Sequence, residues 1–495
     1  MIRSDSLPII LRDLGLIVQV VGIMAIASLG VPLAFQESFA IGPLLITAAL
    51  SLGLGNLLYW PFRRAGEALL WHGMVVAALG WLLVAALGAL PIYLTAIWIT
   101  EAPNTVLEFR DPMNAIFESI SGYTGTGLTM VIDADQLPRT FQWWRSFTEW
   151  VGGMGVIVLM LSIIVGPGPG AHRLYYAEAR EERIHPSVRS TVHTMWWIFA
   201  VYTLVGIGLL WAAGMPIWDA INHSMTGIST GGFSVVDGSI AAYDSLAIEL
   251  ALLPLMVIGA ISFVVHYRIL RGDFSQLWRG IQTRWLLILL VVGILVLWLE
   301  NRSQLLLGEF TVLRDSAFQY VSAMTATGFQ TVDLGAWSPT AQLILTVGMI
   351  IGGAAGSTSG GIKVIRLILL FKGIQWQFRK IIAPRDALTR FELGGKPFDE
   401  TEADRRIGNV STIIFLWILS LGIGVIVLLQ AVPSYAFNEV IFEVASAQGN
   451  IGLSVGITGP NMPLAAKLVL CFNMWIGRLE IIPVLILFRS FLRRI

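Results

Sequence analysis

Four short glycine-containing segments carry residue types that could bind a cation through backbone oxygens. The stretch SGYTGTGLTM at 121–130 is followed by three related ones, namely HSMTGISTGGFSVVD at 223–237, YVSAMTATGFQTVD at 320–333 and VASAQGNIGLSVG at 444–456. Glycine permits backbone conformations that turn successive carbonyl oxygens to one side, and it has no Cβ to obstruct them. A ring of carbonyl oxygens can replace the water shell of a monovalent cation. The repetition therefore predicts four carbonyl-bearing segments around one axis.

The four copies share a pattern upstream of their aligned glycines, which are Gly127, Gly232, Gly328 and Gly452. Nine residues upstream each copy has a polar side chain, from Glu118, His223, Gln319 and Glu443. Thirteen residues upstream stand Asn114, Asp219, Asp315 and Glu439, of which the Asn and Asp residues are good helix N-caps. Each copy thus predicts a short helix followed by an extended segment. We interpret the polar residues nine upstream as hydrogen-bonding groups of that helix, in preference to proton relays.

About ten long apolar windows must position these segments. The 495-residue chain is 56% hydrophobic and 13% charged, with a mean hydropathy of +0.74, which is more apolar than a soluble core requires. Windows of this length match the hydrocarbon thickness of a bilayer. They lie near 12–34, 40–60, 68–99, 143–166, 193–214, 245–267, 285–299, 340–372, 407–431 and 464–488. The third and eighth windows are long enough to be tilted or interrupted.

The distribution of basic residues predicts the orientation of the chain. Most of the 32 Lys and Arg residues fall in alternate connections between the windows and near both ends of the chain. Cytoplasmic loops carry such an excess, so both termini are expected in the cytoplasm. The opposite connections carry carboxylates that would attract cations, namely Glu101, Glu108, Asp111, Asp133, Asp135 and Asp237. The first window has no cleavage site of the A-x-A type after it, which indicates a retained helix.

The motifs of enzymes and of metal sites are incomplete in this chain. The residues GISTG at 227–231 match the nucleophile elbow of hydrolases, but a short helix stands where that elbow needs a strand. Ile362 occupies the position where a phosphate-binding loop requires lysine. The six histidines have no paired ligand spacing, and the single Cys471 excludes an intrachain disulfide. We therefore expect no enzyme activity, no organic cofactor and no nucleic-acid partner.

These observations predict an all-α membrane protein with an internal fourfold repeat. Irregular backbone after a short helix cannot face lipid, because each unpaired backbone group in hydrocarbon costs several kcal/mol. Four helix–pore-loop–helix units around a central pore satisfy this constraint, and two transmembrane helices precede them. The predicted boundaries are 1–66 for the two N-terminal helices, then 67–170, 171–284, 285–400 and 401–495 for repeats 1 to 4.

Together the motifs resemble the Trk/Ktr/HKT superfamily of potassium transporters, and the two extra N-terminal spans resemble its TrkH/TrkG branch. Besides the four glycine segments, three stretches look like second helices of that family's repeats, namely WVGGMGVIVLM at 150–160, GGAAGSTSGGIKVIRLILL at 352–370 and WIGRLEIIPVLIL at 475–487. The similarity covers nearly the whole chain. It implies potassium uptake across the inner membrane of a prokaryotic cell, with K⁺ as the transported ion.

The resemblance also implies which backbone carbonyls bind potassium. They belong to each aligned glycine and to the two residues before it, which are Gly125, Thr126 and Gly127; Thr230, Gly231 and Gly232; Ala326, Thr327 and Gly328; and Asn450, Ile451 and Gly452. Relatives that pass sodium have serine at the position of Gly127, so glycine there favours potassium. The fourth copy diverges most, which predicts an asymmetric selectivity filter.

Two further features of the second helices suggest control of the ion path. Small residues interrupt the eighth window at Gly356, Ser357, Thr358, Ser359, Gly360 and Gly361. The resemblance implies that this stretch is an intramembrane gate below the filter, and the alternative is a plain flexible break in a helix. Arg478 and Glu480 lie inside the last window, where each needs a partner. Arg478 is expected either close to the pore or in a structural ion pair, with Glu443 or Glu118 as candidate partners.

The expected partners are potassium ions, the lipid bilayer, a second copy of the chain and a regulatory subunit. The homodimer and a TrkA-like subunit of RCK nucleotide-binding domains, which would bind NAD(H) or ATP/ADP, are both implied by the resemblance. Basic cytoplasmic residues such as Arg379, Lys380 and Arg385 could dock that subunit. Passive permeation is favoured over proton- or sodium-coupled symport, because no buried acidic relay is evident in the sequence. A sodium or mixed-cation transporter is the alternative.

Overall fold

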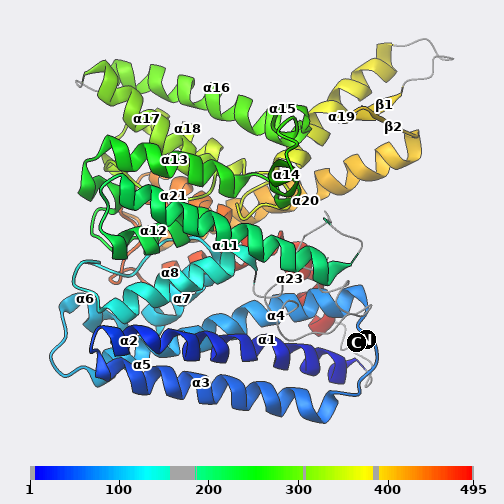
Figure 1. Cartoon of the computed structure of the whole chain (residues 1–495). Coiled ribbons are helices and arrows are strands. Elements are labelled where there is room, and N and C mark those ends of the chain that lie inside the picture. Colours follow the sequence, from blue (N-terminus) through cyan, green and yellow to red (C-terminus); the bar gives the residue numbers. More distant parts are fainter. Residues whose placement is uncertain (1–5, 156–183, 185–186, 305–307, 383–389, 493–495) are drawn as a thin grey trace.

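The computed structural model describes residues 6–155, 184, 187–304, 308–382 and 390–492. Within these residues the predicted all-α fold is confirmed, apart from one hairpin of β1 (Phe391–Leu393) and β2 (Lys396–Phe398). Figure 1 shows the long helices lying side by side, with the N and C markers together at one end of the bundle. The hairpin and the adjoining ends of two long helices project from that same end (Figure 1).

The first helices form a tightly packed pair. They are α1 (Leu7–Ser28), the short α2 (Gly30–Ala34) and α3 (Ser38–Tyr59), which runs on into η1 (Trp60–Phe62). A Cβ added to Gly15 would lie 2.6 Å from the carbonyl oxygen of Gly55, and one added to Gly55 would lie 2.7 Å from that of Gly15. The two backbones therefore touch through glycines, as in many membrane helix pairs.

Four sets of helices follow, and each set contains a first helix, a short helix and a second helix in that order. The first set is α4 (Leu70–Gly88) with α5 (Leu90–Trp98), α6 (Asn104–Leu107) with η2 (Glu108–Arg110), α7 (Pro112–Thr124) and α8 (Arg139–Met154). The second is α11 (Val188–Ala212), α12 (Ile217–Ile228), η3 (Ser239–Tyr243), α13 (Leu246–Ala260), α14 (Phe263–Leu270) and α15 (Gln276–Arg279).

The third and fourth sets have the same order. The third is α16 (Ile281–Gln304), α17 (Glu309–Met324), η4 (Leu334–Ala336), α18 (Pro339–Ile350) and α19 (Val364–Ile382). The fourth, after the hairpin, is α20 (Glu400–Ala431), α21 (Phe437–Gly449), α22 (Leu464–Arg478) and α23 (Ile482–Leu492). We call α7, α12, α17 and α21 the short helices, and α8, α13, α18 and α22 the second helices. The exact domain boundaries stay predictions.

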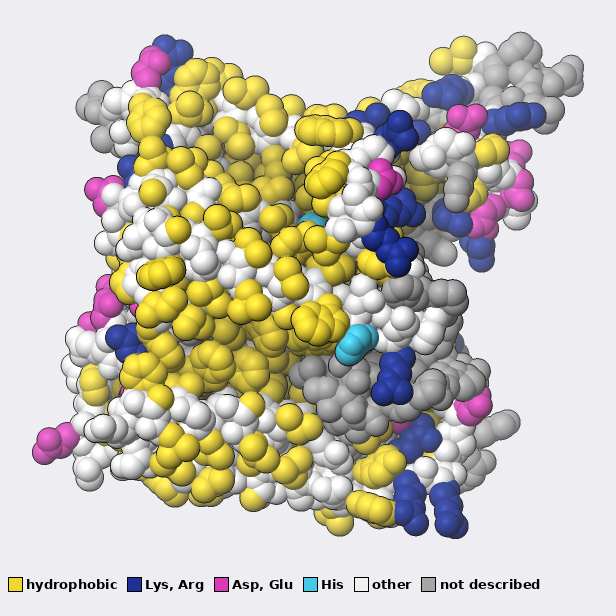
Figure 2. Space-filling model, viewed as in Figure 1, with side chains coloured by type: hydrophobic (Ala, Val, Ile, Leu, Met, Phe, Trp, Pro, Cys, Tyr) yellow, Lys and Arg dark blue, Asp and Glu magenta, His cyan; other side chains and the backbone are white. Residues whose placement is uncertain are grey.

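The described residues contain six helices that are long and apolar enough to cross a bilayer, and two bent helix pairs that could each be one further span. Apolar side chains cover the middle of the molecule in Figure 2, and most of the visible Lys and Arg side chains gather at the end that carries the hairpin. The second half of the 143–166 window, Arg385 and the basic residues between 173 and 183 lie outside the described residues. This banding is typical of a multi-pass membrane protein.

Two of the second helices, α13 and α22, are followed by a sharp bend inside an apolar window. The chain bends by 111° between α13 and α14, within the 245–267 window, and by 109° between α22 and α23, within the 464–488 window. At the first break the Ser262 hydroxyl accepts from the Val264 N–H and caps a new helix. At the second, Glu480 and Ile481 both have positive φ, which ends α22. Apolar windows report burial in lipid or protein but not helix continuity.

The short helices begin earlier than the sequence predicted. The residues expected as N-caps lie inside the helices, because α7, α12, α17 and α21 begin at Pro112, Ile217, Glu309 and Phe437. Asp111 caps α7 by accepting from the Met113 N–H. Glu439 accepts from the Ala436 N–H and so caps α21 from within its first turn. The expected positions were therefore wrong by about one turn in α7, α12 and α21 and by about two turns in α17, although the helices themselves exist.

Candidate functional site

The four aligned glycines meet in a closed ring. A Cβ added to any one of them would overlap the carbonyl oxygen of the residue before the aligned glycine of the next repeat. The overlapping pairs are Gly127 with Gly231, Gly232 with Thr327, Gly328 with Ile451, and Gly452 with Thr126. The fourth pair returns to the first repeat, so the neighbour relation closes after four steps. The structure thus brings the glycine segments (125–127, 230–232, 326–328 and 450–452) together around one axis.

Glycine is required at the aligned positions for two physical reasons. All four have φ between +86° and +97°, a region that side-chain-bearing residues rarely adopt. The overlap with a neighbouring carbonyl leaves no room for a side chain in any case. These glycines therefore let four backbones approach more closely than any other residue would allow.

Each short helix delivers its glycine segment by the same turn. The residue two before the aligned glycine is left-handed in every copy, with φ of +66° at Gly125, +54° at Thr230, +59° at Ala326 and +54° at Asn450. The next residue donates its N–H to the carbonyl six residues upstream of the glycine, in the pairs Thr126–Ser121, Gly231–Thr226, Thr327–Ser322 and Ile451–Ser446. Three of the left-handed residues are not glycine, and each such conformation costs roughly 1–2 kcal/mol. The surrounding packing must supply that energy.

The polar residues nine upstream fasten the chain just after each glycine segment, which confirms their hydrogen-bonding interpretation. Glu118 accepts from the Met130 N–H at 2.8 Å, and Glu443 accepts from the Val455 N–H at 3.1 Å. In the other two repeats the contacts are between side chains, namely His223 with Ser234 at 3.0 Å and Gln319 with Thr331 at 3.0 Å. All four side chains are fully or almost fully buried.

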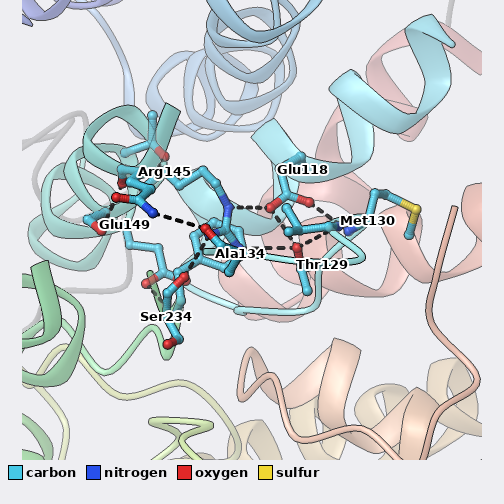
Figure 3. Close-up of polar contacts among 12 residues, drawn as sticks. Glu118, Thr129, Met130, Ala134, Arg145, Glu149 and Ser234 are labelled. Atoms are coloured by element: carbon cyan, nitrogen blue, oxygen red, sulfur yellow. Dashed lines mark hydrogen bonds and ion pairs between the residues drawn. The ribbon is translucent and has the colours of Figure 1, made fainter. Parts of the chain in front are cut away.

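Arg145 links the first two repeats beside the ring, a role that the sequence analysis did not identify. Figure 3 shows it reaching from α8 toward Glu118, with Nε at 2.6 Å from a carboxylate oxygen. Its Nη1 donates to the carbonyl oxygen of Ser234 at 2.8 Å, and its guanidinium lies 4.1 Å from the centre of the Phe233 ring. Both members of the ion pair are buried. Outside the glycine ring a cavity of about 170 Å³ is lined by the four aligned glycines and Arg145.

A second ring of polar contacts joins the second helices to the short helices of the following repeat. Its members are Gln142 with Trp218 at 2.8 Å, Glu249 with Arg314 at 2.7 Å, Gln342 with Asn438 at 2.5 Å, and Lys467 with Asn114 at 2.6 Å. The second-helix members lie ten residues before glycines that recur in all four repeats, Gly152, Gly259, Gly352 and Gly477. An alignment of the second helices on those glycines would have revealed these residues in the sequence.

The small-residue loop (residues 351–363) lies beneath the glycine ring, between α18 and α19. The hydroxyl of Thr358 donates to the carbonyl oxygen of Gly259 at 2.9 Å and also lies 3.2 Å from that of Ile228, the last residue of α12. A Cβ added to Gly360 would overlap the carbonyl oxygen of Gly449, the last residue of α21. The loop therefore covers the carbonyl ends of two short helices. A plain flexible break in a helix would not need these contacts with two other repeats.

Arg478 lies under the ring and contacts the same loop. It donates to the carbonyl oxygens of Gly152, Gly153 (3.0 Å) and Thr358 (3.4 Å). The loop, Asn450 and Arg478 also line a cavity of about 40 Å³, which is room for a small number of water molecules.

The sequence analysis considered an ion pair of Arg478 with Glu118 or Glu443, but both carboxylates have other partners. Glu118 pairs with Arg145, and Glu443 accepts from residues 454–458 of its own repeat. Glu480 pairs with Arg366 of α19. Arg478 instead donates to backbone carbonyl oxygens of the first and third repeats, and its place beside the pore stays a prediction.

The chemistry available at the site is that of neutral oxygen ligands. Within the described residues, no group of three His, Cys, Asp or Glu side chains is placed to hold a metal ion. Backbone carbonyl oxygens suit alkali ions, because they can replace a hydration shell without binding too tightly for release. The carbonyl ends of the short helices add partial negative charge below the ring.

Comparison with known proteins gives consistent matches over nearly the whole chain. Residues 44–493 match the family model TrkH, described as a cation transport protein. An uncharacterized cation transporter of Methanocaldococcus jannaschii is 33% identical over 482 residues, which is 97% of this chain and 95% of that protein. The Trk system potassium uptake protein TrkH of Salmonella typhimurium is 33% identical over 456 residues, covering 89% and 90% of the two chains.

A solved structure matches the fold as well. The crystal structure of the potassium transporter TrkH from Vibrio parahaemolyticus superimposes with a TM-score of 0.82 at 27% sequence identity. The match covers 98% of each chain.

Proposed function

Because the chain belongs to the TrkH family of cation transport proteins, we propose that it takes up potassium ions across the membrane of a prokaryotic cell. It is a multi-pass membrane protein of the Trk superfamily, and it is a transporter and not an enzyme. The predicted sites and the mechanism that follow are parts of this proposal.

The observation that carries the proposal is the closed ring of aligned glycines. In the proposed function, the ring is the selectivity filter, and the carbonyl oxygens of the four glycine segments take over the hydration shell of a passing ion. Potassium is the proposed ion, because relatives named for potassium uptake share the fold and because Gly127 stands where sodium-passing relatives of the superfamily have serine. Asn450 and Ile451 differ most from the other copies, which supports a filter that is not strictly fourfold.

The small-residue loop is the proposed gate. It lies under the filter, is hydrogen-bonded to the carbonyl end of α12 and packs closely against that of α21, and an ion leaving the ring would otherwise meet these groups. Arg478 adds a positive charge at the same level, which disfavours a second cation there until the loop and its contacts rearrange. Opening therefore requires Thr358 and the loop to move away from Ile228 and Gly259.

Passive permeation is the proposed mechanism, with proton- or sodium-coupled symport as the alternative. A homodimer and a TrkA-like subunit of RCK domains are the proposed partners.

The proposed cytoplasmic side is the end of the bundle that has the N and C markers. Most of the visible Lys and Arg side chains lie at this end (Figures 1 and 2). The arm of α19, the hairpin and α20 projects there, and it includes Arg379 and Lys380, so it is the proposed docking site of that subunit.

Ion flux into liposomes that contain the purified protein tests the function. Potassium, rubidium, sodium and lithium are compared in wild type and in Gly232→Ser. We expect wild type to prefer potassium and rubidium, and Gly232→Ser to lose that preference, because its Cβ would overlap the carbonyl oxygen of Thr327. A wild type that passes sodium as well as potassium would favour the mixed-cation alternative. An unchanged series in Gly232→Ser would place the ion path elsewhere.

A further inference from the structure

A buried carboxylic acid, Glu149, lies directly behind the second glycine segment. It is on α8 of the first repeat, one turn after Arg145, and its side chain is 0% exposed. One oxygen, Oε2, accepts from the N–H of Phe233 at 3.0 Å, and Phe233 follows the aligned Gly232. Within the described part of the chain, the other oxygen has no hydrogen-bond partner. Figure 3 shows Glu149 on the same helix as Arg145 but outside the network that Arg145 forms with Glu118.

The carboxyl group also fills the space beside Gly231. A Cβ added to Gly231 would lie 2.5 Å from both Cδ and Oε2 of Glu149. The carbonyl of Gly231 is in turn the one that faces Gly127 in the ring. Glu149 therefore touches the backbone on both sides of Gly232, and any change in its length or acceptor is transmitted to the ring.

No other repeat has an acid at this position. Glu149 lies three residues before Gly152, and the residues three before the corresponding glycines are Met256, Met349 and Met474. All three methionines are buried. Methionine fills such a space but offers only a weak acceptor. The second segment thus has no methionine behind it but a carboxyl group, which accepts a hydrogen bond from its backbone.

The residues six upstream of the aligned glycines also make different contacts in the different repeats. In the third repeat the hydroxyl of Ser322 donates to the carbonyl of Phe329 at 2.8 Å, and in the fourth the hydroxyl of Ser446 accepts from the N–H of Gly452 at 3.0 Å. In the second repeat the hydroxyl of Thr226 donates instead to Asn222 within its own helix. Thr226 therefore makes neither of these contacts, and the Ser121 hydroxyl of the first repeat has no hydrogen-bond partner in the part of the chain that the structure describes. The second segment differs from the first in that Glu149 of the preceding repeat accepts a hydrogen bond from it.

We propose that Glu149 is a positioning residue for ion selectivity, which fixes the second segment of the filter through the acceptor Oε2. The inference rests on the proposed function and adds to it a residue that makes the filter asymmetric. Its role depends on the reach of the acceptor. A side chain with an equivalent acceptor at the same distance should replace Glu149, whereas one that is shorter or has no oxygen should not.

Three substitutions separate reach, the ionisable group and volume. Glu149→Gln keeps an oxygen acceptor at the same reach without an ionisable group, Glu149→Asp keeps the carboxyl group but is one methylene shorter, and Glu149→Met copies the other repeats. Potassium and sodium permeability are measured by reversal potentials in liposomes containing the full chain. We expect the ratio of potassium to sodium permeability in Glu149→Gln to stay within about twofold of the wild-type value. Glu149→Asp and Glu149→Met should lower this ratio by about fivefold or more, because each loses one hydrogen bond. Met256→Leu is the matched control and should leave the ratio unchanged.

A second measurement does not depend on transport. Thermal unfolding is followed in potassium and in sodium, because an ion that binds the folded filter raises the unfolding temperature. The extra stabilisation by potassium should persist in Glu149→Gln and shrink in Glu149→Met. The positioning role would be overturned if Glu149→Met kept the wild-type permeability ratio. It would also be overturned if Glu149→Asp kept that ratio while Glu149→Gln lost it. A wild-type protein without potassium preference would instead overturn the proposed function itself, whatever the variants show.

Discussion

The hydroxyl of Thr358 lies 3.2 Å from the carbonyl oxygen of Ile228, although the two residues belong to different repeats. Ile228 is the last residue of α12, where the partial negative charge of the helix is concentrated. The same hydroxyl donates to Gly259 and accepts from the hydroxyl of Thr230 at 3.2 Å. One side chain of the small-residue loop therefore satisfies the groups that a cation would meet after the proposed filter.

Replacing this hydroxyl should open the path. In Thr358→Val the side chain keeps its shape but loses its bonds to Ile228 and Gly259. Because each bond contributes about 0.5–1.5 kcal/mol, we expect the unregulated protein to pass potassium about 5 to 30 times faster. Flux into liposomes without any regulatory subunit measures this.

The control for that experiment is Ser357→Ala. The Ser357 hydroxyl donates to Ala354 within the loop and does not tie the loop to another repeat. We expect flux at the wild-type level. If Thr358→Val also stays at that level, the loop does not gate the path.

A methyl group on the ring should block or distort the filter. In Gly328→Ala the new Cβ would overlap the carbonyl oxygen of Ile451, at a residue with φ of +87°. Strain of this kind costs about 1–3 kcal/mol, so potassium flux should fall about tenfold or more. Gly459→Ala is the matched control, because no atom lies within 4 Å of its added Cβ and its φ is not in the left-handed region. Equal flux in the two variants would contradict the role of the ring.

The buried ion pair between Arg145 and Glu118 should matter far more for folding than an exposed one. Arg145→Met leaves a buried carboxylate without its counter-charge, which costs about 3–5 kcal/mol and should lower the unfolding temperature clearly. Arg302→Met breaks the exposed pair with Glu309 and should cost only about 0.2–1 kcal/mol. Thermal unfolding in detergent compares the two.

A double variant identifies the cause of that loss. Arg145→Met with Glu118→Gln removes both charges, so it should unfold at a higher temperature than Arg145→Met alone. Similar unfolding of Arg145→Met and Arg302→Met would show that the buried pair does not hold the first two repeats together.

Much of the architecture followed from local features of the sequence. Apolar windows predicted the long helices because burial in lipid needs a continuous apolar stretch, and the exceptions are windows 245–267 and 464–488, where the chain bends. The four aligned glycines predicted the ring because only glycine fits where φ is positive and the backbone of the next repeat is in contact. Residues such as Glu118 were identified because a polar group at a fixed offset from the glycine binds its own repeat.

The sequence by itself therefore determined the all-α class, the fourfold repeat and the residues of each glycine segment, since these depend on short-range spacing and hydropathy. Only the tertiary structure decided which repeat follows which around the ring, what Arg478 contacts and that Glu149 supports the second segment. Those contacts join residues that are far apart in the chain. Glu149 and Phe233 are 84 positions apart, and Arg478 and Gly152 are 326 positions apart. They depend on the rotation and packing of whole helices, which no local pattern encodes.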